Sequence, residues 1–209
     1  MSCQPGTRQF WMAFFSPWLH DDAAQLVEFA VSLPLLVVFV VGIFDFSGAF
    51  TLKQKLTVAA RDAARSAAGL PANDLGSAFG PGGAPISVTS ALQIVDNYMI
   101  TQKLNDCGLS SASPTQAGLT WTYTAPGNGC PGSGITVIIN RGYVFPSNGP
   151  QLPTSCGPQN PNSGVNLVGT CVSLQYGYQW RFDRVVALLG LSDSLPSNLT
   201  SIAVAMNED

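Results

Sequence analysis

Four cysteines after residue 100 are the side chains best placed for covalent chemistry. Cys107, Cys130, Cys156 and Cys171 follow a long apolar run, whereas Cys3 precedes it. An even set in a Gly-, Pro-, Ser- and Asn-rich region predicts two disulfides and an oxidising compartment. Among the three possible pairings we favour Cys107 with Cys130 and Cys156 with Cys171, because short loops close most easily. Buried free thiols are the alternative, and zinc is disfavoured because paired CxxC spacings are missing.

The sequence offers few residues for a catalytic, metal or nucleotide-binding site. A serine or cysteine nucleophile needs a base, and the one histidine, His20, lies on the other side of the apolar run. The C-terminal half holds few acids, and no phosphate loop or dinucleotide fingerprint occurs. Net charge is -3 without a Lys or Arg cluster, which disfavours nucleic-acid binding. We therefore expect no enzyme, no catalytic residue, no metal and no cofactor.

The apolar run itself predicts a membrane anchor. Charged residues are 10% and hydrophobic residues 46% of the chain, and Phe29 to Phe44 is almost wholly apolar. A bilayer core needs about 20 helical residues, so the run spans it if Glu28 and Asp45 lie near the two faces. A secretory signal cut after Ala49 is disfavoured, since the flank before the run is acidic.

The sequence continues as an alanine-rich helix beyond the apolar run and meets stop signals at Gly69 and Pro71. Ala60, Ala64 and Ala68 recur every fourth residue, so they share a face. Small residues at this spacing let another helix approach closely, which predicts packing with another subunit. The alternative is packing on the protein's own domain.

The remaining chain predicts an α+β fold with a small antiparallel sheet. We expect a Gly- and Pro-rich linker over 70–89 and an extracytoplasmic α+β domain over 90–209, in which a helix capped by Ser90 precedes the strands. The expected strands are about four: GLTWTYTA, GITVIINRGYVF, TCVSLQYGYQWRF and TSIAVAMNE.

Charge and cysteines disagree about orientation in the membrane. Lys53, Lys55, Arg61 and Arg65 follow the run and Arg8 precedes it, so counting positive charges places the C-terminal domain in the cytoplasm. Four cysteines in a loop-rich domain argue for the oxidising side. We give the cysteines more weight.

At the N-terminus, AAQLVEFAVSLPLLVVFVVGIFDFSGAFTLKQKLTVAARDAARSAA resembles the signature of TadE-like proteins, which are minor pilins of the tight-adherence (Flp) pilus system. The shared features are the small residue pair, the VEF element, a proline in the apolar run, the DF pair and the later AARxAAR. The closing segment, YQWRFDRVVALLGLSDSLPSNLTSIAVAMNE, is similar to the end of the family more loosely.

This resemblance implies that a prepilin peptidase removes a leader, residues 1–23, by cutting between Ala23 and Ala24. Family members usually have glycine where this chain has Ala23. The mature chain would begin with a helix over 24–69, and Glu28 would be its fifth residue. In related pilins an acid at this position pairs with the exposed N-terminal amine.

The resemblance also implies a role and partners. The expected protein is a minor pilin that supports pilus assembly through helix-mediated association with other minor pilins and assembly-platform proteins, as a hetero-oligomer. It would be a single-pass protein of the bacterial inner membrane in contact with lipid, with a periplasmic C-terminal domain, and incorporation into the pilus is compatible with this role. The alternative is an anchored extracytoplasmic binding protein or adhesin that uses its Gly/Asn-rich loops.

Overall fold

The computed structural model describes residues 18–75, 83–127, 129–145, 153–157, 168–182 and 195–208. The chain divides into two compact units, Met1–Phe44 and Asp45–Asp209, which are described separately below. The first helix, α1 (Trp18–Ala68), contributes to both units. Cys3 lies outside the described residues.

In the first unit, α1 is an isolated apolar helix. From Ala24 onwards it contains a window with a mean hydropathy of 2.6 of which nothing is buried by the protein, so by length and composition it is a candidate membrane span. Large side chains such as Phe29 and Phe39 are more than half exposed. Pro34 lies inside the helix without ending it. The helix begins at Trp18, and so part of the expected leader, 1–23, is helical.

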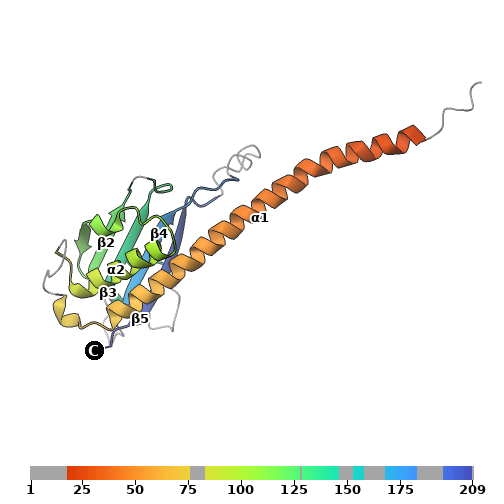
Figure 1. The fold of residues 1–209 in the computed structure, drawn as a ribbon. Helices are drawn as coiled ribbons and strands as arrows, with labels where there is room; N and C mark the ends of the chain where they lie inside the picture. The colour runs from red at the N-terminus through yellow and green to blue at the C-terminus, as the bar shows by residue number, and fades with distance from the viewer. Residues whose placement is uncertain are drawn as a thin grey trace, which may run out of the picture. The chain divides into compact units, whose positions relative to one another are not determined.

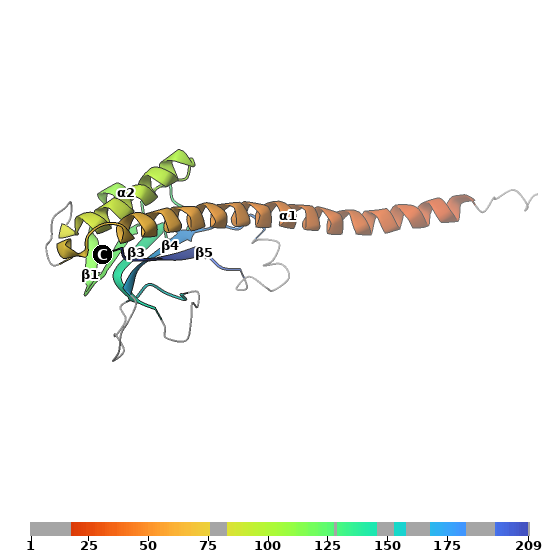
Figure 2. The same ribbon diagram turned by 90° about the horizontal axis from the view of Figure 1, so that it is seen from below.

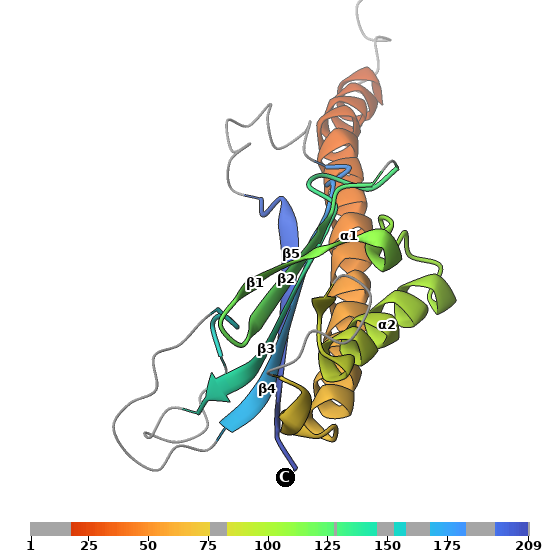
Figure 3. The same ribbon diagram turned by 90° about the vertical axis from the view of Figure 1, so that its left-hand side faces the viewer.

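The second unit is an α+β layer, as the sequence predicts. Five strands form one antiparallel sheet in the order β1-β2-β3-β4-β5 (Figure 1). Figure 2 and Figure 3 show α2 and the C-terminal part of α1 on the same side of this sheet. The bounds are α2 (Ile86–Thr101), β1 (Pro114–Ala117), β2 (Thr120–Ala125), β3 (Ile135–Val144), β4 (Val168–Gly177) and β5 (Asn198–Met206).

The sheet contains one strand more than the four expected. Strand β1 is short, begins with Pro114 and is mostly exposed, so it has no apolar alternation to reveal it. It pairs with β2 through a two-residue turn at Gly118 and Leu119, where Gly118 has a φ of 59° that glycine adopts readily. Strand β4 also ends at Gly177, and the YQWRF segment that we expected to extend it is a loop.

The second helix begins earlier than the sequence predicts. Pro85 occupies the cap position and its carbonyl accepts hydrogen bonds from the N–H groups of Val88 and Thr89. The fixed φ of proline suits a helix start, which explains the difference. The expected cap, Ser90, lies within α2, where its hydroxyl is 3.3 Å from that of Ser66. The linker 70–89 is therefore shorter than expected, and it also contains a short 3-10 helix, η1 (Ala72–Asp74).

Two apolar clusters lie on opposite faces of the sheet. The larger one joins α1, α2 and strands β2 to β5, with Trp121 and Leu56 among its fully buried side chains. The smaller one contains Tyr143, Cys156 and Cys171. Strand β4 is consequently buried along most of its length, because both of its faces are covered.

A buried arginine joins α1 to the sheet. The β3–β4 register shifts between Asn140 and Tyr143, and Arg141 in this irregular stretch is fully buried. Its Nη1 donates hydrogen bonds to the carbonyl of Ala67 and, at 2.7 Å, to the hydroxyl of Thr170, and its Nη2 donates to the carbonyl of Leu70 at 2.8 Å. A cation near the unpaired carbonyls at a helix C-terminus is favourable. Arg141 therefore fixes the end of α1 on the sheet.

We expect Arg141→Lys to lower the free energy of unfolding of the second unit by about 2 kcal/mol, because an ammonium cannot reproduce the planar fork that reaches Ala67 and Leu70 together. Near-UV circular dichroism during urea unfolding in detergent measures this change. Arg61→Lys is the matched control, since Arg61 is exposed on the same helix. Equal stability of the two variants would contradict this role.

Candidate functional site

One face of α1 carries the sequence features expected to act in processing and assembly. Ala24, Val27, Glu28 and Val31 are all exposed, and the peptide bond between Ala23 and Ala24 lies inside the helix. Glu28 is the only charged residue between Ala24 and Phe44. This face therefore presents one carboxylate on an otherwise apolar helical surface.

The helical spacing determines what Glu28 can pair with. Residues four apart in a helix are neighbours on its surface, and Ala24 and Glu28 have this spacing. An N-terminal amine at Ala24 would thus lie one turn from the Glu28 carboxylate. A carboxylate in hydrocarbon is costly unless it has such a partner. The local geometry allows this ion pair to form within one chain.

Asp45 is a buried carboxylate at the start of the second unit. It is 5% exposed, and both of its oxygens accept hydrogen bonds from the segment after β4. Oδ1 accepts from the Tyr178 hydroxyl at 3.0 Å and Oδ2 from the Phe182 N–H at 2.9 Å. Burial, followed by the contact with Asp45, raises the pKa of the Tyr178 phenol. Asp45 therefore holds a loop of distant sequence against α1.

Aromatic rings complete this contact, which we call the Asp45 clasp (Asp45, Phe46, Tyr178, Trp180 and Phe182). The ring centroids of Phe46 and Trp180 are 5.2 Å apart, and those of Tyr178 and Trp180 are 4.9 Å apart in an edge arrangement. The Trp180 indole donates a hydrogen bond to the Pro196 carbonyl at 2.8 Å, which links both ends of the β4–β5 connection.

Sequence reasoning placed Asp45 near a membrane face and missed the Asp45 clasp. Its partners were assigned to a strand because YQWRF alternates. The sequence shows only that Asp45 and Ala49 are four residues apart, and the structure shows that both are buried. An acid on the buried face of a helix needs a partner within the protein.

The alanines expected to pack against another subunit are covered by the protein itself. Ala60, Ala64 and Ala68 are at most 2% exposed, and Ala60 and Ala64 belong to the apolar cluster that α1 forms with α2 and the sheet. The structure thus shows the alternative, packing on the protein's own domain, while packing of this face against another subunit stays a prediction. Within the domain these small side chains form part of the larger apolar cluster.

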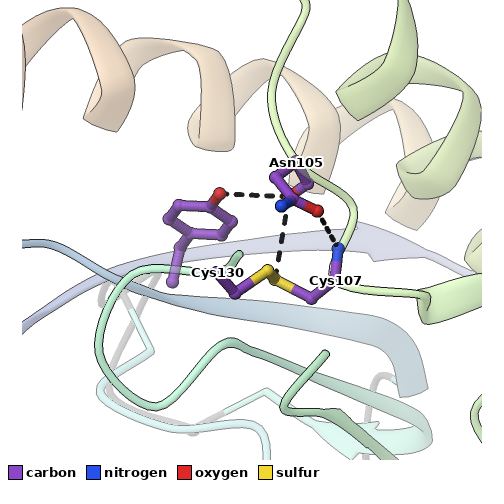
Figure 4. Close-up of a disulfide and its surroundings, with 4 residues drawn as sticks. Asn105, Cys107 and Cys130 are labelled. Atoms are coloured by element: carbon purple, nitrogen blue, oxygen red, sulfur yellow. Dashed lines mark hydrogen bonds between the residues drawn. A yellow bond between two sulfur atoms is a disulfide. The ribbon is translucent and has the colours of Figure 1, made fainter. Parts of the chain in front are cut away.

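The first disulfide joins Cys107 to Cys130, as short loop closure favours, and fixes the segment after α2 (Figure 4). Asn105 supports it: its side-chain oxygen accepts a hydrogen bond from the Cys107 N–H at 2.9 Å, and its carbonyl accepts one from Tyr176 at 3.0 Å. A Cβ on Gly127 would lie 2.1 Å from the Cys107 carbonyl oxygen, so only glycine fits there.

The second disulfide joins Cys156 to Cys171 on the face of the sheet opposite the helices, again between sequential cysteines. Both cysteines are fully buried. Asn140 adds a hydrogen bond to the Gly157 carbonyl at 2.9 Å. The disulfide therefore attaches part of the long β3–β4 connection to β4. Much of that connection, which holds Gly/Asn-rich sequence, lies outside the described residues.

Comparison with known families identifies the helix. Residues 23–65 match the family model described as TadE-like protein. This segment is TadE-like. It contains Ala23, Ala24, Glu28 and Asp45 and ends before the linker and the sheet. No curated protein and no solved structure matches the chain.

The TadE-like segment supports a Tad pilus-associated protein with a candidate membrane anchor. Its resemblance in sequence, noted from the VEF, DF and AARxAAR elements, is confirmed by the family match. The segment includes two different surfaces, the exposed apolar helix before Asp45 and the helix buried by the domain after it.

Two of the positive charges in the TadE-like segment contact the domain. The Lys53 ammonium donates a hydrogen bond to the Thr200 carbonyl, and that of Lys55 donates to the Gln102 carbonyl at 3.4 Å. These lysines therefore help to hold α1 to β5 and to the end of α2. Arg61 and Arg65 are exposed.

We expect Asp45→Ala to release the segment Tyr178–Phe182, because the Phe182 N–H loses its acceptor and the Tyr178 hydroxyl keeps only the Asp45 backbone carbonyl, at 3.1 Å. Arg181 is exposed in this segment. Trypsin should then cleave after Arg181 several-fold faster than in the unmodified protein, as measured by mass spectrometry of timed digests. Asp62→Ala, an exposed acid on the same helix, should leave the rate unchanged. Unaltered cleavage of the Asp45 variant would exclude the clasp.

We expect Ala64→Leu to destabilise the second unit by about 1–3 kcal/mol, because the larger side chain overpacks the interface between α1 and the domain. Gln54→Leu, at an exposed position of the same helix, is the control. Urea unfolding followed by near-UV circular dichroism measures both. A stable Ala64 variant that loses pilus partners would instead support the prediction of a subunit-facing surface.

Proposed function

We propose that this protein is a non-enzymatic, membrane-anchored minor pilin that supports assembly of a tight-adherence pilus. The observation that carries the proposal is the exposed apolar helix of the TadE-like segment, with Glu28 as its one charge. Association with other subunits would use this exposed part of α1. The alanine face after Asp45 is buried by the domain.

Lipid tails can cover most of this apolar surface, but they cannot pair with the Glu28 carboxylate. Hydrocarbon tails can cover Leu26, Phe29 and Val31, whose exposed area would be unfavourable in water. They offer no hydrogen-bond donor to a carboxylate. Glu28 therefore needs a polar or cationic partner, either the amine of its own chain at Ala24 or a group on a neighbouring helix.

The Glu28 carboxylate can also pair with the N-terminal amine of a second chain. If the bond between Ala23 and Ala24 is cleaved, every subunit carries an amine and an acid one turn apart. When helices lie side by side, the amine of one chain can also reach the acid of the next. This pairing would select partners of related sequence, namely other minor pilins, and would give a hetero-oligomer that contacts assembly-platform proteins.

The proposal places the domain in the periplasm and the helix in the bacterial inner membrane. Two disulfides in the domain fit an oxidising compartment. The contacts of Lys53 and Lys55 with carbonyls of the domain give these positive charges a role besides topology.

We expect Glu28→Ala to keep membrane insertion and to reduce recovery of pilus subunits about tenfold, because the N-terminal amine then lacks its partner in the apolar phase. Crosslinking in cells followed by affinity purification and quantitative mass spectrometry measures this recovery. Ser32→Ala is the matched control on the same helix face.

Intact mass measured on the same purified samples separates processing from assembly. A mass that begins at Ala24 in both the Glu28 variant and the control shows that cleavage is unaffected and that the loss lies in association. Undiminished recovery of pilus subunits with the Glu28 variant would refute the proposed role of this acid.

A further inference from the structure

Two phenylalanines at the Asp45 clasp are exposed just after the apolar run of α1 ends. Phe46 and Phe50 are 57% and 65% exposed, and they are four residues apart in this helix. Residues at that spacing share one helix face, so the two rings are neighbours on the surface. Burial of such a side chain stabilises by about 1.5–3 kcal/mol. The two rings therefore favour a covering that the described residues do not supply.

The place of the two rings in the chain indicates what covers them. They follow the run 29–44 by two and six residues, and α1 continues through them without interruption. The interfacial layer on each side of a bilayer core is about 5–8 Å thick, and four helical residues rise about 6 Å. When the run fills the bilayer core, Phe46 and Phe50 fall within the interfacial layer. A lipid surface is thus continuous with the candidate membrane span.

The loop after β4 adds the aromatic types that prefer this layer. Trp180 is partly exposed, its ring centroid lies 5.2 Å from that of Phe46, and its indole donates a hydrogen bond to the Pro196 carbonyl at 2.8 Å. Trp and Tyr are enriched at membrane interfaces because they combine an apolar ring with a polar group. The Tyr178 hydroxyl is held by Asp45. Because the rings are already fixed, lipid binding costs them little conformational entropy.

The charges beside these rings have the sign that suits lipid headgroups. Arg181 is exposed in the loop after β4, and Lys53 is exposed three residues after Phe50, with one of its three donors used by the Thr200 carbonyl. Long cationic side chains are favourable beside lipid phosphates. The Asp45 carboxylate is buried and accepts hydrogen bonds from within the protein, so it presents little negative charge to an anionic surface.

We propose that the clasp surface, formed by Phe46, Phe50, Trp180 and Arg181, binds the headgroup layer of the membrane. The rings lie at the level of the lipid glycerol groups, and Arg181 contacts the phosphates. This inference rests on the membrane anchoring in the proposed function, and it adds a contact through which the domain itself holds to the bilayer. Another protein subunit is the competing occupant. Lipid is favoured because it already borders the adjoining run.

Photocrosslinking of the full-length protein in cell membranes tests the occupant. The photoreactive residue p-benzoylphenylalanine replaces Phe50, and mass spectrometry of the irradiated protein detects attached phospholipid. The same residue at Phe39, within the apolar run, is the positive control, and at Val58, an exposed position eight residues further along α1, the negative control. We expect lipid adducts at Phe39 and Phe50 and about tenfold fewer at Val58, because the interfacial layer ends within about 8 Å of the bilayer core.

The controls separate this inference from the proposed function. Lipid adducts at Phe39 without any at Phe50 overturn the clasp surface alone and leave the membrane anchor intact. Protein adducts at Phe50 in place of lipid identify another subunit as the occupant and also overturn the inference. Absence of lipid at Phe39 removes the anchor, and then the proposed function and this inference fail together.

Trp180 gives an independent measurement on the full-length protein in nanodiscs. The difference in fluorescence between the unmodified protein and Trp180→Phe isolates the emission of this indole from that of the remaining tryptophans. Lipids brominated near the headgroup should quench this emission about twofold more strongly than lipids brominated near the chain ends, because Trp prefers the interface. Emission that neither lipid quenches would exclude Trp180 from the lipid layer and overturn the proposed surface.

Discussion

The packing of α1 on the sheet is the constraint on which the domain depends. Small side chains form part of the packed face of this helix, and Ala60 and Ala64 are buried there. The contact also buries the carbonyl end of α1, which needs hydrogen-bond donors away from water. Arg141 supplies them from β3. The alanines therefore give α1 a small packed face, and the arginine supplies hydrogen bonds to the carbonyl groups at its end.

The same helix meets two different environments along its length. Before Asp45 its large apolar side chains are exposed, and after Asp45 its small side chains are buried. This division separates a part suited to lipid and neighbouring helices from a part committed to the domain. The Asp45 clasp marks the beginning of the second part, because its carboxylate holds the loop after β4. The TadE-like segment thus combines a candidate membrane anchor with one structural layer of the domain that follows it.

The disulfides do more than close loops in this structure. The Cys107–Cys130 bond fixes the segment after α2, and Cys156–Cys171 attaches part of a long connection to the other face of the sheet. Pairing between sequential cysteines limits each constraint to one region.

The sequence alone determined those features that depend on local pattern. The apolar run predicted the anchor, alanine and the stop residues predicted the end of α1, and β-branched alternation predicted four of the five strands, since each of these signals lies within one segment. The tertiary structure decided which surface each residue faces. The four-residue spacing of Ala60 and Ala64 is the same whether the neighbour is another subunit or the protein's own sheet, and YQWRF alternates although it forms a loop held by Asp45.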